Sequence, residues 1–208
     1  MRKLFVWFLA FALIVISSSL VACGPKVTGP KSHLIPAAEA EDAGDWEFPV
    51  VANTGEFGIG ETVKLSDVVK NPDVKVVLLD YWATWCEPCK EEMPYLQQIY
   101  LKNKDKGLCP LVITIDSSES LKSHIIKAVT NMKWKKDFGE FKGGDPANIT
   151  YTIPWDLKNS SKNIYGITSI PVTYLIDKNN KIRYKHSGFT EELMEELEAA
   201  VDEILAEK

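Results

Sequence analysis

The distribution of apolar residues predicts alternating strands and helices. Residues 76–82 and 111–115 are apolar runs, the first broken only by Asp80, and such runs are typical of strands buried on both faces of a sheet. After each run, apolar residues recur at helical spacing, over residues 86–101 and 120–132. This order of strand, helix, strand and helix predicts an α/β domain.

Shorter elements are expected around this unit. Residues 48–66 alternate β-prone pieces with glycines, which predicts an N-terminal hairpin, and a helical turn is expected at residues 65–69. Residues 135–147 are polar, contain three glycines and a proline, and are expected to form an inserted loop. Nearer the C-terminus we expect an edge strand at 152–155, a short helix at 160–165, a hairpin of strands at 172–177 and 182–186, and a helix at 190–206.

The predicted helices each have an apolar face. In the helix over residues 120–132, four side chains are expected to face the sheet: Leu121, Ile125, Ile126 and Val129. The final helix carries several glutamates rather than the many basic residues of a membrane-surface helix, so we expect it to pack on the sheet.

The first 22 residues have the features of a signal peptide. Arg2 and Lys3 precede the apolar run 4–16, which is shorter than the roughly 20 residues of a spanning helix. The next tetrapeptide, Leu-Val-Ala-Cys, resembles the bacterial lipobox, in which the cysteine becomes the N-terminus and takes a diacylglycerol. We therefore expect Cys23 to be the lipid anchor. An uncleaved anchor, or an ordinary signal peptide with a chance cysteine, is the alternative.

This interpretation divides the chain into a signal peptide (1–22), a lipidated cysteine with a flexible tether (23–45) and a folded domain (46–208). The tether is expected because its residues include few large apolar side chains. Such a lipoprotein would lie in a bacterial cell envelope, facing the periplasm or the cell exterior. Gly24 is not the Asp that favours the inner membrane, which leaves the choice of membrane open.

Composition limits the possible partners. With 208 residues, 45% of them hydrophobic, the chain is expected to bury one core and to be a monomer. Its formal charge is −5, and loss of Arg2 and Lys3 leaves 22 basic against 29 acidic residues, a net −7. Such a surface does not suit nucleic acid. Four cysteines are too few for an extensive disulfide framework.

The chemistry is expected at the sequence Cys86-Glu87-Pro88-Cys89, which directly follows the first buried strand and opens a helix. The backbone N–H groups and dipole of a helix N-terminus stabilise a thiolate on the first cysteine. Cys86 is therefore the expected nucleophile, and Cys89, one turn deeper, the resolving thiol. A zinc half-site or a static disulfide is the alternative.

The remaining candidates indicate no site. His33, His124 and His186 are scattered in the sequence, and we expect each on the surface. Cys109 begins a predicted strand and is expected to be a buried packing thiol.

Two separate motifs carry a resemblance to a known family. The first is Trp-Ala-Thr-Trp-Cys-Glu-Pro-Cys-Lys at 82–90, and the second is Thr-Ser-Ile-Pro-Val-Thr-Tyr-Leu-Ile-Asp at 168–177. From about residue 48 onward the sequence resembles the thioredoxin superfamily, within it the membrane-tethered TlpA/ResA-like redoxins related to AhpC/TSA proteins. The resemblance implies a thioredoxin-like fold, with a central mixed β-sheet flanked by helices.

The resemblance also implies the residues that contact substrate. It places a cis peptide bond between Ile170 and Pro171 beside the cysteines, which leaves the Ile170 backbone open to an extended substrate segment. The other expected substrate contacts are Trp85, Glu87 and Pro88. An ordinary strand-start proline is the alternative for Pro171.

Two acids match catalytic positions of the family. Asp80 matches the buried carboxylate beneath the cysteines, and Glu92 matches an active-site glutamate of the ResA-like reductases. Negative charge there disfavours the thiolate and lowers the reduction potential, which indicates a reductase. The alternatives are a structural Asp80 held by local hydrogen bonds and an exposed Glu92 in the first helical turn.

The expected mechanism is attack of the Cys86 thiolate on a substrate disulfide, followed by release through Cys89 with Asp80 or Glu92 accepting its proton. No cofactor is implied. The family suggests a membrane electron donor of the CcdA/DsbD type, and apocytochrome c or other secreted proteins as substrates. We also expect the 135–147 insertion to lie away from the cysteines.

Three other classes of protein are alternatives to a reductase. A peroxiredoxin-like peroxidase requires a Pro-x-x-x-Thr-x-x-Cys loop, which this chain lacks. A metal-delivery protein of the SCO kind requires Cys-x-x-x-Cys-Pro, a different spacing. A non-enzymatic binding lipoprotein on a thioredoxin fold stays open on sequence alone.

Overall fold

The computed structural model describes residues 33–53, 56–130 and 149–207. The predicted signal peptide, Cys23 and the 135–147 insertion lie outside these residues. Within the described ranges, no helix has both the length and the apolar character needed to cross a membrane.

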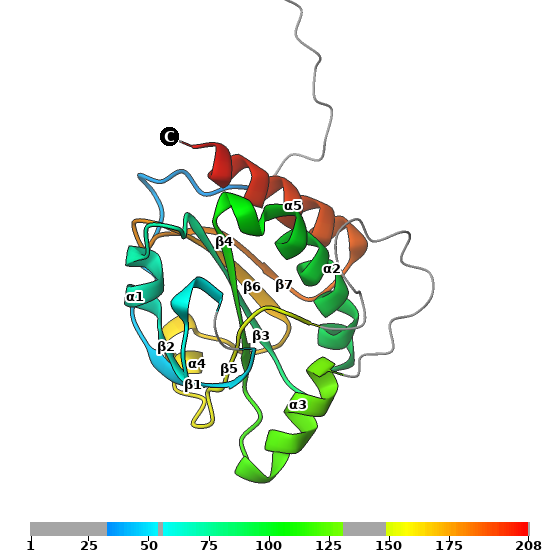
Figure 1. Cartoon of the computed structure of the whole chain (residues 1–208). Helices are drawn as coiled ribbons and strands as arrows, with labels where there is room; N and C mark the ends of the chain where they lie inside the picture. Colours follow the sequence, from blue (N-terminus) through cyan, green and yellow to red (C-terminus); the bar gives the residue numbers. More distant parts are fainter. Residues whose placement is uncertain (1–32, 54–55, 131–148, 208) are drawn as a thin grey trace, which may run out of the picture.

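Two sheets form the centre of the described structure (Figure 1). The larger has the order β4-β3-β6-β7, formed by Leu108–Thr114, Val76–Trp82, Val172–Asp177 and Ile182–Ser187. The smaller has the order β2-β1-β5, formed by Thr62–Lys64, Glu47–Ala52 and Ile153–Pro154. β3 pairs in parallel with β4 and antiparallel with β6, so the central sheet is mixed, as predicted.

Helices cover both faces of the larger sheet. The α-helices are α1 (Leu65–Lys70), α2 (Glu87–Asn103), α3 (Lys122–Thr130), α4 (Ser161–Tyr165) and α5 (Glu191–Ala206). Short 3-10 turns occur at Glu56–Gly58, Lys104–Lys106 and Glu119–Leu121. α2 and α5 lie side by side (Figure 1). The fold is therefore the predicted thioredoxin-like α/β architecture, with the N-terminal hairpin formed by β1 and β2.

The alternation of side chains along β3 decides which residues face the site. Leu78 and Trp82 pack into the core beneath α2, α3 and α5, whereas Leu79 and Tyr81 pack into the core beneath α1 and α4. Because strand residues two apart share a face, Asp80 lies on the α2 side.

One predicted helix face needs correction. Ile125 and Val129 are buried, but Ile126 is 37% exposed. Ile125 and Val129 are four residues apart and share a helix face, while Ile126 is rotated by about 100° from its neighbour. The prediction that Ile126 faces the sheet was wrong.

Residues 35–43, which the sequence assigned to the tether, pair with the folded domain. The N–H groups of Ile35 and Ala43 donate to Arg183 and Asn180 at 2.7 and 2.9 Å, and Ile182 donates to Glu41 at 2.9 Å. β7 is the edge of its sheet, and this segment supplies partners for the hairpin that contains it. Backbone pairing of this kind leaves no apolar pattern in the sequence.

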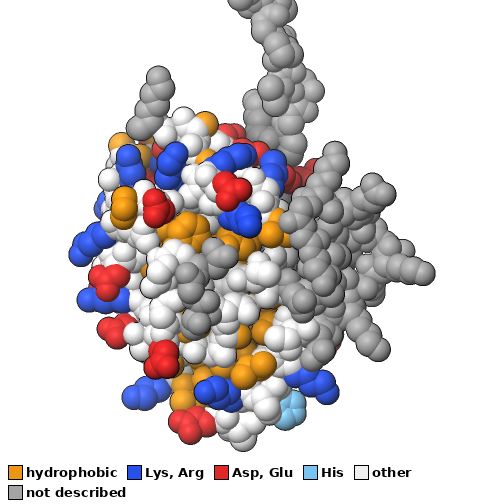
Figure 2. All heavy atoms as spheres, in the orientation of Figure 1, with side chains coloured by type: hydrophobic (Ala, Val, Ile, Leu, Met, Phe, Trp, Pro, Cys, Tyr) orange, Lys and Arg blue, Asp and Glu red, His pale blue; other side chains and the backbone are white. Residues whose placement is uncertain are grey.

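Basic and acidic side chains are interspersed over the described face in Figure 2, with apolar side chains between them. Neither sign of charge gathers into one large patch on that face.

Candidate active site

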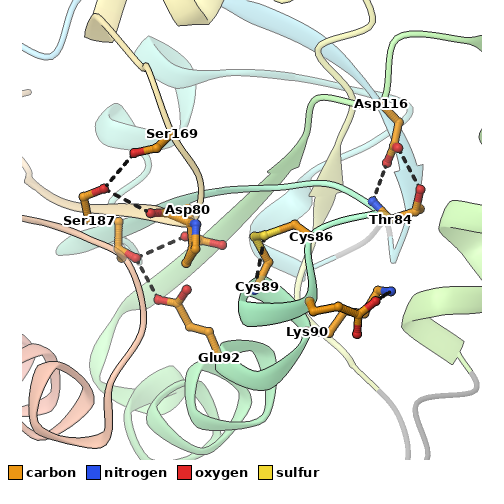
Figure 3. The surroundings of a disulfide bond; sticks show 12 residues. Asp80, Thr84, Cys86, Cys89, Lys90, Glu92, Asp116, Ser169 and Ser187 are labelled. Carbon is orange, nitrogen blue, oxygen red and sulfur yellow. Dashed lines mark hydrogen bonds and ion pairs between the residues drawn. A yellow bond between two sulfur atoms is a disulfide. The ribbon is translucent and has the colours of Figure 1, made fainter.

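Cys86 and Cys89 form a disulfide at the N-terminus of α2, with their Cα atoms 5.4 Å apart (Figure 3). Cys86 is the residue that caps the helix, and its Sγ accepts a hydrogen bond from the Cys89 N–H at 3.3 Å. Pro88 fits the first turn because its missing N–H would have no partner there. Cys86 is 5% exposed and Cys89 1%, so Cys86 is the more exposed residue of the pair.

The loop before Cys86 is fixed by a residue that sequence reasoning missed. The buried Asp116 carboxylate accepts hydrogen bonds from the N–H and hydroxyl of Thr84, at 3.0 and 2.8 Å, and from the Thr114 hydroxyl at 2.7 Å. The Asp116 carbonyl accepts from the Trp155 indole at 2.6 Å. Parallel strands end at the same sheet edge, so an acid just beyond β4 was a usable signal for a contact with the loop after β3.

The two predicted acids meet beneath the disulfide. Asp80 is 1% exposed and Glu92 is fully buried, and both approach the Thr173 hydroxyl, at 3.1 and 3.0 Å. Figure 3 shows both beside the cysteine pair. One hydroxyl has one hydrogen to donate, so the second contact is favourable when that carboxyl is protonated and donates to the threonine oxygen. The alternative of an exposed Glu92 is wrong.

Burial favours the protonated form of both acids. It raises the pKa of Asp80 well above its usual value, and the Glu92 charge raises it further, while the Thr173 hydrogen bond acts in the opposite direction. Burial raises the pKa of Glu92 from 4.5 to about 8. At neutral pH the oxidised protein therefore holds a proton on this buried pair of acids.

His186 is a further buried group that the sequence analysis placed on the surface. It lies in β7 opposite Thr173 and is 7% exposed, and its Nε2 is 3.4 Å from Oε1 of Glu92. Burial lowers the pKa of His186, while Asp80 and Glu196 act in the opposite direction. The missed signal was its spacing of two from the apolar Tyr184 in a strand. His33 and His124 are exposed, as predicted.

The predicted substrate-contact residues lie at the end of β3 that leads to the disulfide and at the adjacent start of β6. The Ile170–Pro171 bond is cis, as predicted. Pro171 directly precedes β6, and the first residue of that strand, Val172, pairs with Tyr81 near the end of β3. Trp85, next to Cys86, is 65% exposed. Glu87 is exposed and pairs with Lys90 at 2.7 Å.

Cys109 is buried in β4 as predicted, opposite Val77 at the start of β3. The disulfide follows the other end of β3. Cys109 is therefore placed away from the cysteine pair.

The AhpC/TSA family model matches residues 40–185. The thiol-disulfide oxidoreductase ResA of Oceanobacillus iheyensis is 34% identical over 121 residues, which are 58% of this chain and 52% of that protein. ResA of Bacillus cereus is 27% identical over 145 residues, 70% of each chain. A Chlorobium tepidum structure assigned as the thiol:disulfide interchange protein DsbE is 27% identical with a TM-score of 0.61, covering 80% of this chain and 97% of that one.

The matched stretch spans about half the length of the Oceanobacillus relative and more of the Bacillus one. The family model covers the central sheet and the cysteine pair, and the solved relative shares the fold across nearly its whole length. The chain therefore belongs to the AhpC/TSA family, as a ResA-like member with the thioredoxin fold.

Proposed function

We propose that this protein is a thiol:disulfide oxidoreductase that reduces disulfides of protein substrates through Cys86 and Cys89. The observation that carries the proposal is a disulfide at a helix N-terminus, with Cys86 the more exposed of its two residues and with two buried acids beside it whose pKa values are raised by burial. The names of the ResA and DsbE relatives support the same chemistry.

Substrate reduction requires two exchange steps. The Cys86 thiolate attacks one substrate sulfur, the substrate S–S bond breaks, and the other substrate sulfur leaves as a thiolate that takes a proton. Cys89 then loses its proton and attacks Sγ of Cys86, which breaks the mixed disulfide and releases the second substrate thiolate. The substrate gains two electrons, and the protein is left in the disulfide form of Figure 3.

The buried acids balance the protons of this cycle. When a donor dithiol reduces the disulfide, Cys89 leaves as a thiolate, and the Asp80–Thr173–Glu92 group supplies the proton it needs. When Cys89 attacks in the next cycle, the same group takes the proton back. Once this group has given up its proton, its negative charge disfavours a nearby thiolate, which favours a reducing pair.

The same proposal includes the cellular setting. The signal-like N-terminus and the Cys23 box support a lipid-anchored location outside the cytoplasm, where a membrane donor of the CcdA/DsbD type would re-reduce the protein. Apocytochrome c cysteines are the first substrates to test. A lipid anchor and a monomeric state are parts of this proposal.

Peroxidase activity is the less favoured alternative for a member of this family, because the chain lacks the Pro-x-x-x-Thr-x-x-Cys loop. The two buried acids disfavour a non-enzymatic binding role. Burying a carboxyl group costs free energy, and a binding module has no proton transfer that would require one there.

The test is reduction of insulin by dithiothreitol in the presence of the full chain in detergent micelles. Wild type should accelerate insulin precipitation, and both Cys86→Ser and Cys89→Ser should reduce the rate to that of dithiothreitol alone. Cys109→Ser is the matched control and should retain activity, because Cys109 lies at the far end of the sheet. An inactive wild type whose disulfide stays closed in dithiothreitol would contradict the proposal and support a binding role.

A further inference from the structure

His186 completes a row of polar side chains across the sheet. In the strand registers, Asp80 in β3 lies opposite Thr173 in β6, and Thr173 lies opposite His186 in β7. Directly opposed residues of neighbouring strands point to the same face. All three therefore face the α2 side, where Glu92 covers them.

Glu92 is shared between two members of this row. Its Oε1 is 3.0 Å from the Thr173 hydroxyl and 3.4 Å from Nε2 of His186. Within the described residues, neither ring nitrogen of His186 nor Oε2 of Glu92 has a hydrogen-bond partner. A buried imidazole without a partner is costly, and the nearest group that can pair with it is the Glu92 carboxyl.

The other groups around His186 are known from the structure. The Tyr184 ring lies 5.5 Å from the imidazole on the same strand. Burial lowers the pKa of His186, whereas the negative charges of Asp80 from β3 and Glu196 from α5 raise it. Oε2 of Glu196 also lies 3.3 Å from Nδ1 of His33. The titratable groups facing the imidazole are thus three acids and a tyrosine.

We propose that His186 is a positioning residue for Glu92, whose imidazole holds the Glu92 carboxyl and so sets how readily it exchanges a proton with Cys89. This inference rests on the proposed reductase function. A neutral imidazole can donate a hydrogen bond to the Glu92 carboxylate, or it can take the Glu92 proton and become an imidazolium beside that carboxylate. Either arrangement stabilises the ionised form of Glu92, so Glu92 ionises more easily than it would with Thr173 alone.

Replacement of His186 should therefore move the pH dependence of the reaction. In His186→Phe, which keeps a ring of similar shape but has no nitrogen, Glu92 should ionise at higher pH. The acid limb of the rate of substrate reduction should shift upward by about one pH unit. Tyr184→Phe is the matched control, because it removes one buried polar atom from the same strand face, and its profile should match wild type.

The outcomes separate this inference from the proposed function. An inactive wild type contradicts the function itself. An active wild type with the same pH profile in His186→Phe overturns only the inference. If His186→Phe fails to fold, the imidazole is titrated by NMR in wild type and Glu92→Gln. A changed His186 titration in Glu92→Gln supports the contact, and an unchanged one overturns it.

Discussion

At the scale of single residues, the site is a group of buried side chains that can share a proton. Thr173 contacts both Asp80 and Glu92, and His186 contacts Glu92 from the next strand. In the proposed cycle the two acids exchange protons with Cys89, and the three groups should then titrate as a coupled system rather than independently. The consequences can be measured one residue at a time.

Asp80→Asn should make the Cys86 thiolate easier to form. The substitution removes an acid that competes with the thiols for ionisation, so the apparent pKa of Cys86 should fall and the couple should become more oxidising. Substrate reduction should nevertheless slow by about 10- to 100-fold, because a proton acceptor for Cys89 is lost. Thiolate absorbance against pH and glutathione equilibration measure both effects, with a smaller shift expected for Glu92→Gln. Unchanged values in Asp80→Asn would show that this carboxylate is only structural.

Glu92 should also make folding stability fall with rising pH. Its pKa is about 8 in the folded protein against 4.5 ordinarily, so the folded state holds a proton that the unfolded state has released between these values. The stabilising contribution is full below pH 4.5 and is lost as the pH rises through about 8. The free energy of unfolding of the oxidised protein, measured with urea from pH 5 to about 9, should fall more steeply in wild type than in Glu92→Gln, by up to about 1.4 kcal/mol per pH unit. Parallel curves would contradict the buried, protonated state.

At the scale of helices and strands, the sequence predicted most of what the structure contains. Apolar runs and helical spacing located β3, β4, α2 and α5, because burial on a sheet imposes those periods directly. Contacts between distant elements were not predictable in this way. Asp116 holds the loop after β3, and His186 faces Glu92, only because strand register brings them there. The Cys86–Cys89 pair and Asp80 were predictable because motif and strand lie together in the sequence.

Asp116 should therefore control the reactivity of Cys86 through the loop. Asp116→Ala leaves the Thr84 N–H and the Thr114 hydroxyl without their acceptor, so it should lower stability by about 2–4 kcal/mol. It should also slow alkylation of reduced Cys86 by about tenfold, because the sulfur is no longer held at the helix N-terminus.

The matched control is Asp156→Ala. Asp156 is as buried as Asp116 and accepts hydrogen bonds from the backbone and hydroxyls of Ser160 and Ser161 at the start of α4. It should lower the free energy of unfolding by a similar amount, about 2–4 kcal/mol, and leave alkylation of Cys86 unchanged. Equal effects of the two variants on alkylation would show that Asp116 has no specific role.

At the scale of the whole molecule, part of the segment that the sequence assigned to the tether belongs to the domain. Ile35 and Ala43 donate backbone hydrogen bonds to the hairpin of β6 and β7. Attachment of this domain to a membrane through Cys23 is a part of the proposal that can be tested separately from the redox chemistry.

Cys23→Ser tests the anchor. Wild type expressed in a bacterium should gain the mass of a diacylglycerol and partition into detergent, and the variant should lose both properties. Cys109→Ser is the control, since its buried thiol is not expected to be acylated. A wild-type chain without added mass would rule out the lipid anchor while leaving the redox chemistry untouched.

The central claim is that Cys86 attacks substrate and Cys89 resolves the mixed disulfide, and intact-mass analysis of trapped adducts tests it most directly. Reduced Cys89→Ser, mixed with insulin whose disulfides are intact, should accumulate a covalent one-to-one adduct. The adduct should map to Cys86 and be released by dithiothreitol. Reduced Cys86→Ser should form little adduct, because Cys89 is 1% exposed beneath the helix start. Adducts of equal yield in both variants, or none in Cys89→Ser, would contradict the account.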